Sequence, residues 1–132
     1  MLSSPPSYTC QTGDPPPGLQ WRAHPQGPGV TRMSLSGELD LLSAPSLGDT
    51  LAEAARGSVA VILDLSQLTF LDSSGLHAIM TARARLAEAD CRLVLLRGNH
   101  HVQRVFELSG VDGVLEFVSA RDAGYLAALR SS

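Results

Sequence analysis

Two short runs of apolar, β-favouring residues most strongly constrain the fold of this chain. They occupy positions 59–63, Val-Ala-Val-Ile-Leu, and 93–96, Leu-Val-Leu-Leu. A strand that is apolar at every position is buried on both faces of its sheet. Between the runs lies a helical pattern with the apolar stripe Leu76, Ile79, Met80 and Ala87. We therefore expect a parallel part of a sheet, built by a right-handed crossover through a helix.

The N-terminal half predicts a hairpin followed by a helix. Apolar and polar residues alternate over 19–24 and again over 31–36, on either side of the Pro/Gly-rich turn cluster 25–29. Two alternating runs around such a turn are typical of an antiparallel hairpin. Pro45 favours the first turn of a helix, where its missing N–H does no harm, with Ser43 as the candidate N-cap.

The C-terminal part continues the alternation of helices and strands. Asn99 begins a short helix that Gly110 stops, 115–118 is a short strand, and Ser119 caps a final amphipathic helix. The whole order is β-β-α-β-α-β-α-β-α. It predicts an α/β fold, one domain over 19–132, in which helices flank a mixed central β-sheet.

Composition excludes several classes of function. Residues 1–18 hold five of the eight prolines and are expected to form a disordered tail. The net charge is −3 and no basic run is present, so we expect no direct nucleic-acid partner. The apolar runs are too short to cross a membrane, and no signal peptide is recognisable, which favours a cytoplasmic protein. Cys10 and Cys91 match no metal or redox spacing, so no cofactor is expected.

The segment with most chemical content is Asp72-Ser73-Ser74-Gly75, where a buried strand gives way to a helix. The free N–H groups and the dipole of a helix N-terminus favour an anion, so a serine there can carry a phosphate. Gly75 lacks a Cβ, which would let another protein's active site approach the hydroxyls. Ordinary N-capping explains the same residues, and from these residues alone it is the more common explanation.

Two other kinds of chemistry fit the sequence poorly. A serine hydrolase elbow, Gly-x-Ser-x-Gly, would need glycine where Leu71 or Asp72 stands, and His77 shares a helix with the serines. The adjacent His100 and His101 have no Cys, Asp or Glu at metal-ligand spacing. We therefore expect neither an enzyme nor a metal site.

A second segment, Ser36-Gly37-Glu38-Leu39-Asp40, ends the hairpin and precedes the Pro45 helix. Gly37 would allow a tight exit from the strand, and Asp40 would lie in the following loop. A simple strand-to-helix turn accounts for these residues too.

Together these segments resemble the STAS family, the sulfate transporter and anti-sigma factor antagonist domains. The resemblance extends from about Leu19 to the C-terminus and implies a single STAS domain. It is carried by four stretches, 36–40, 61–65, 70–76 and 99–111.

The resemblance implies a function as an anti-sigma factor antagonist that regulates transcription. In bacterial members the second serine of Asp-Ser-Ser-Gly is phosphorylated, which corresponds to Ser74. The kinase is the anti-sigma factor itself, with a histidine-kinase-like ATPase fold, and the unphosphorylated antagonist binds it and releases the sigma factor. A serine phosphatase resets the switch. Other STAS proteins are phosphorylation-independent subunits of stress-signalling scaffolds or lipid-transport complexes, and this alternative stays open.

The predicted docking surface surrounds Ser74. We expect the docking lip to consist of Asp72, Ser73, Gly75 and Leu76. We expect the adjoining loop to be shaped by Gly37, Glu38 and Asp40. A phosphate adds about −1.5 to −2 charges beside these acidic side chains, which disfavours burial against a partner.

Overall fold

The computed structural model describes residues 18–111 and 113–119 of the chain. Within these residues it contains five strands and three helices. They are β1 Leu19–Gly27, β2 Val30–Leu39, α1 Ala44–Ala55, β3 Ala60–Leu71, α2 Ser73–Glu88, β4 Arg92–Leu96, α3 His100–Ser109 and β5 Phe117–Val118. The predicted order is confirmed as far as β5. The predicted tail and the helix predicted after Ser119 lie outside the described residues, apart from Gly18.

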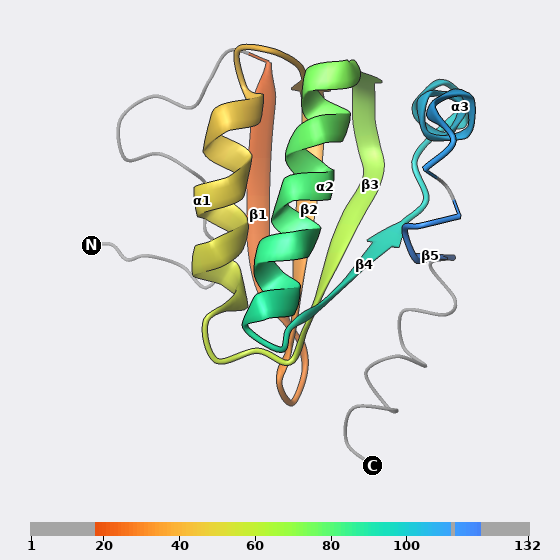
Figure 1. The fold of residues 1–132 in the computed structure, drawn as a ribbon. Coiled ribbons are helices and arrows are strands. Elements are labelled where there is room, and N and C mark those ends of the chain that lie inside the picture. The colour runs from red at the N-terminus through yellow and green to blue at the C-terminus, as the bar shows by residue number, and fades with distance from the viewer. Residues whose placement is uncertain (1–17, 112, 120–132) are drawn as a thin grey trace.

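The strands form one mixed sheet in the order β1-β2-β3-β4-β5. β1 and β2 are antiparallel, as the hairpin pattern predicts, and the β2–β3, β3–β4 and β4–β5 pairs are parallel. Figure 1 shows α1 and α2 side by side over one face of this sheet, with α3 at the side of β3 and β4. The mixed α/β architecture predicted from the sequence is therefore confirmed.

The core is built around β3, which contributes side chains to both faces of the sheet. Val61, Leu63 and Leu65 pack into the main cluster with Leu47, Leu51 and Ile79 of the covering helices. Ile62 points the other way, into a smaller cluster with Val30 and Leu96. This arrangement confirms a strand buried on both faces at 61–63, but β3 begins only at Ala60, and Val59 before it is exposed.

The strands differ in length from the predictions. β3 continues beyond the apolar run through residues 66–71, because these residues pair with β2 across two register shifts. β1 runs through Pro25 to Gly27, so the hairpin turn is shorter than predicted. Proline is tolerated there because β1 is an edge strand, where a missing N–H need not break a ladder. β5 is only two residues long, Phe117–Val118.

The buried side of α2 also differs in part from the predicted stripe. Leu76 and Ile79 are buried as expected, but Ala82 and Leu86 complete the stripe. Ala87 is exposed. Ala82 and Leu86 follow Ile79 by three and seven residues, so they lie on the same face of α2 as Ile79, the face that packs on β4 and α1.

A charged pair lies on the sheet face opposite α1 and α2, with Asp64 buried and Arg32 half-buried. Arg32 Nη2 donates to Asp64 Oδ2 at 2.5 Å, and the backbone N–H of Ser66 donates to Asp64 Oδ1 at 2.9 Å. Burial by itself raises the pKa of the Asp64 carboxyl, but the hydrogen bonds from Ser66 and Arg32 outweigh it and hold the pKa below its ordinary value. The charged form of Asp64 therefore stabilises the fold.

Acid should weaken this contribution. Because the folded-state pKa of Asp64 lies below the unfolded-state value, the stabilisation is fully present above the unfolded pKa and is lost as the pH falls through the folded pKa. Asp64→Asn should abolish this part of the pH dependence of the unfolding free energy below about pH 4. Urea unfolding at several pH values measures it, with Asp49→Asn on exposed α1 surface as the charge control. Parallel curves for wild type and Asp64→Asn would contradict the assignment.

Candidate functional site

The parallel pairing of β2 with β3 brings the two motif segments to the same end of the sheet. Leu39 and Leu71 are partners in the β2–β3 register, so the residues that follow each strand leave the sheet side by side. The backbone N–H of Asp72 donates to the carbonyl of Leu39 at 3.3 Å. The sequence placed both segments at strand ends, and the register explains why they meet.

Asp72 is the N-cap of α2. Its backbone is extended, with φ −114°, and its Oδ1 accepts a hydrogen bond from the Gly75 N–H at 3.0 Å. One of the unpaired N–H groups of the first turn is therefore satisfied by a carboxylate, which also suits the helix dipole. The capping function that the sequence left open for a serine thus belongs to Asp72.

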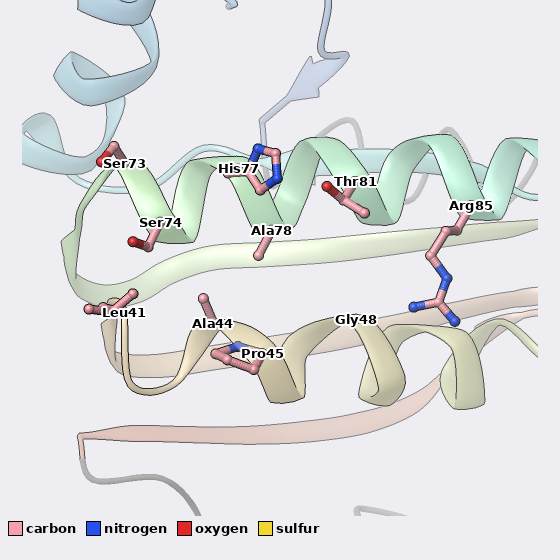
Figure 2. A pocket seen from close by; sticks show the side chains of 10 residues that line it. All are labelled: Leu41, Ala44, Pro45, Gly48, Ser73, Ser74, His77, Ala78, Thr81 and Arg85. Atoms are coloured by element: carbon pink, nitrogen blue, oxygen red, sulfur yellow. The ribbon is translucent and has the colours of Figure 1, made fainter.

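The two serine hydroxyls consequently have no capping task. Neither Ser73 Oγ nor Ser74 Oγ is hydrogen-bonded to another described residue. Ser73 is exposed and Ser74 is half-buried. Figure 2 shows Ser74 on the side of α2 that faces α1 and Leu41, with Ser73 on the outer side of the same turn. The two neighbouring hydroxyls therefore face different surroundings.

Gly75 and Leu76 lie beneath this surface. Both are buried. A Cβ on Gly75 would lie 2.6 Å from the Leu39 carbonyl oxygen and 2.7 Å from Leu71 Cδ1. The missing side chain lets the first turn of α2 pack directly on the ends of β2 and β3. The space left by the missing Cβ of Gly75 therefore faces the ends of β2 and β3, although the sequence led us to expect it beside the hydroxyls. That Gly75 and Leu76 belong to a docking lip stays a prediction.

Gly37 has a comparable task on the hairpin side. Its φ is +92°, and a Cβ would lie 1.7 Å from the carbonyl oxygen of Gly18. That carbonyl accepts a hydrogen bond from the Glu38 N–H at 2.6 Å, and Thr69 Oγ1 donates to the Gly37 carbonyl at 2.9 Å. Gly37 thus joins the beginning of β1 to the end of β2, as a tight exit requires.

Asp40 holds the loop between β2 and α1. Its Oδ1 accepts from the N–H groups of Leu42, at 3.1 Å, and Ser43, at 3.2 Å. Ser43 Oγ in turn accepts from the Asp40 N–H at 2.9 Å and lies 3.0 Å from the Glu38 carbonyl oxygen. Ser43 is fully buried and occupies the N-cap position of α1, but its side chain makes no capping bond. The predicted N-cap instead fixes the loop.

This loop presents two large apolar side chains that the sequence analysis missed. Leu41 is 69% exposed and Leu42 is 70% exposed. Phe70, near the end of β3, is 46% exposed and pairs with Glu38 in the register. An apolar pair in a short polar loop before a helix is a signal that could have identified them. Exposed apolar residues gathered beside one site are typical of protein contact surfaces.

A groove of about 540 Å³ runs between α1 and α2, beginning at Ser74. Figure 2 shows the side chains that line it. They are Leu41, Ala44, Pro45, Gly48, Ser73, Ser74, His77, Ala78, Thr81 and Arg85. The groove thus connects the serines, the exposed loop and the middle of both helices on one surface.

The chemistry of the described residues is limited at this site. No hydrogen bond joins the exposed His77 to Ser73 or Ser74. Across residues 18–111 and 113–119, no three His, Cys, Asp or Glu side chains are grouped to hold a metal ion. None of the described helices is long and apolar enough to span a membrane.

Comparison with known proteins places this geometry in a family. The family model described as "Mlab, STAS domain" matches residues 23–118, which include both motif segments. The chain belongs to the STAS family. The resemblance found in the sequence is thereby confirmed.

This STAS domain has relatives named for sigma-factor regulation. It is 30% identical to the anti-sigma-F factor antagonist RsfB of Mycobacterium tuberculosis over 92 residues, 69% of this chain and 75% of the relative. An anti-sigma factor antagonist from Mycobacterium paratuberculosis matches with a TM-score of 0.72 and 26% identity, over 98% of this chain and 99% of that chain. The unphosphorylated form of the antagonist SpoIIAA, a Bacillus protein, matches with a TM-score of 0.68 and 21% identity, over 85% and 97%. This last match concerns the fold alone.

Proposed function

We propose that this protein is an anti-sigma factor antagonist whose binding to an anti-sigma factor is gated by phosphorylation of Ser74. The observation that carries the proposal is that Asp72, and not a serine, caps the N-terminus of α2. Asp72 caps the helix, which leaves the Ser74 hydroxyl without a hydrogen bond to any described residue, in a groove that the exposed Leu41 also lines. In this scheme the protein is a substrate and a binding partner, not an enzyme.

The relatives support the choice of partner. RsfB and the Mycobacterium paratuberculosis protein both have names that describe antagonists of anti-sigma factors. The partner that we propose is an anti-sigma factor that is also a serine kinase with a histidine-kinase-like ATPase fold. A serine phosphatase would return Ser74 to its unmodified state.

Phosphorylation would act through local charge. A phosphate on Ser74 adds about −1.5 to −2 charges at neutral pH, next to the Asp72 carboxylate. The N-terminus of α2 stabilises this anion while it is solvated. Burying it against a partner that offers no cation removes that solvation and weakens the complex. No rearrangement of the fold is required.

Phosphopeptide mapping tests the proposal. The purified protein is incubated with Mg-ATP and a lysate of its host, and trypsin then releases residues 57–83 as one peptide. We expect one phosphate on Ser74, absent from Ser74→Ala and retained in the matched control Ser73→Ala. An unmodified peptide, in a lysate that phosphorylates another known substrate, would contradict the proposal and favour a phosphorylation-independent STAS subunit.

A further inference from the structure

The groove between α1 and α2 extends the surface around Ser74 well beyond the phosphorylation site. Ser74 and Leu41 lie at one end, and Gly48 and Arg85 lie at the other (Figure 2). Between the two ends, Ala44 and Pro45 of α1 face Ala78 of α2, together with the polar His77 and Thr81. The exposed apolar loop is therefore continuous with a shaped channel that could receive a side chain of another protein.

Arg85 gives the far end of this groove a positive charge. Among the described residues that line the groove, Arg85 is the single Arg, Lys, Asp or Glu. His77 is the other titratable side chain among them. The Arg85 side chain is exposed and forms no ion pair with a described residue. It reaches over α1, where a Cβ on Gly48 would lie 3.1 Å from Arg85 Nη1. Gly48, in the middle of a helix, thus leaves room for the guanidinium.

The distance along α2 separates Arg85 from the phosphorylation site. Ser74 and Arg85 are eleven positions apart on α2, and at a rise of 1.5 Å per residue their Cα atoms lie about 16 Å apart. The guanidinium is directed toward Gly48, not toward Ser74 (Figure 2). A phosphate on Ser74 is therefore out of its reach, and the anion that fits Arg85 must come from another molecule.

We propose that this groove is a second docking point for the anti-sigma kinase, which inserts an apolar side chain between α1 and α2 and places a carboxylate on Arg85. The inference rests on the proposed function and adds to it the chemistry of the partner. The positive charge of Arg85, which forms no ion pair with a described residue, and the continuity of the groove with the exposed Leu41 favour a protein occupant that supplies a carboxylate. The two points of contact on this chain, Ser74 and Arg85, would then be about 16 Å apart between their Cα atoms.

Charge reversal tests the inference, and α2 offers a matched control. Arg83 is also exposed but lines a separate depression with Arg92 and Glu116. Initial rates of Ser74 phosphorylation are measured against antagonist concentration, using the host's anti-sigma kinase purified by this activity. We expect Arg85→Glu to raise KM about tenfold with little change in kcat, since it removes a docking contact and adds repulsion. Arg83→Glu should stay within about twofold of the wild type, and Arg85→Lys should retain most of the affinity.

The outcomes separate this inference from the function on which it rests. Equal KM values for Arg85→Glu and Arg83→Glu would contradict the groove assignment and leave the phosphorylation switch intact. A wild-type protein that gains no phosphate on Ser74 would overturn both. Thermal melts test whether the three variants are folded. We expect all three to be folded, because the substituted positions are exposed.

Discussion

Replacing Ser74 by glutamate is expected to weaken the complex with the anti-sigma factor about a hundredfold. The new carboxylate would have to be desolvated in the contact beside Asp72, at a cost of about 3 kcal/mol, which corresponds to slightly more than a hundredfold in Kd. The fold itself should tolerate the change. The Ser74 hydroxyl bonds to no described residue, and an acidic side chain suits the first turn of a helix. The unfolding free energy should therefore stay within about 0.5 kcal/mol of the wild type.

Two variants make this result specific to position and charge. Ser74→Ala removes the phosphoacceptor without adding charge, and its affinity should stay near that of the unmodified protein. Ser73→Glu places the same charge on the outer side of the same helical turn, and we expect a smaller loss of affinity. Titration calorimetry with the purified anti-sigma factor compares all three. If Ser74→Glu bound as tightly as Ser74→Ala, a charge at this position would not control the complex.

Gly37→Ala is expected to cost the domain about 3 kcal/mol or more of unfolding free energy. A positive φ is unfavourable for alanine by about 1–2 kcal/mol. The new Cβ would also lie 1.7 Å from the Gly18 carbonyl oxygen, a backbone atom that cannot rotate away. Relieving that overlap must separate the beginning of β1 from the end of β2, which adds an overpacking cost of about 1–3 kcal/mol. The Glu38 N–H would lose its 2.6 Å hydrogen bond to Gly18 as well.

Gly57 provides the matched control for this prediction. Its φ is +77°, close to the φ of Gly37, but a Cβ there would meet no atom of the described residues within 4 Å. Gly57→Ala should therefore show the conformational cost alone, about 1–2 kcal/mol. Urea unfolding of the wild type and both variants measures the difference. Equal losses of unfolding free energy for Gly37→Ala and Gly57→Ala would show that the close approach of Gly37 to Gly18 does not contribute to stability.

The arrangement of elements could be predicted because it depends on local patterns. The run at 59–63 is apolar at every position, so burial on both sheet faces could be predicted from this local pattern alone. The second half of β3 could not be predicted in this way. Ser66, Gln67 and Thr69 break the apolar pattern, and the strand continues there because β2 provides a pairing partner through two register shifts. Such tertiary pairing overrides a weak local preference.

The candidate site shows the same division between local and tertiary information. The sequence located Ser74 at a helix N-terminus, since strand, polar motif and helix follow one another in the chain. It could not assign the inward packing of Gly75, because the Leu39 carbonyl that it faces comes from another strand. The groove leading to Arg85 was missed for the same reason, since it exists only where α1 and α2 pack together.

In the proposed switch, a phosphate on Ser74 controls the contact with the anti-sigma factor. The most direct test is to measure Kd for that factor with the unmodified protein and with the same protein phosphorylated on Ser74. We predict micromolar or tighter binding for the unmodified form and a loss of at least about a hundredfold after phosphorylation. Equal affinity of the two forms would contradict the switch and identify this STAS domain as a constitutive binding subunit.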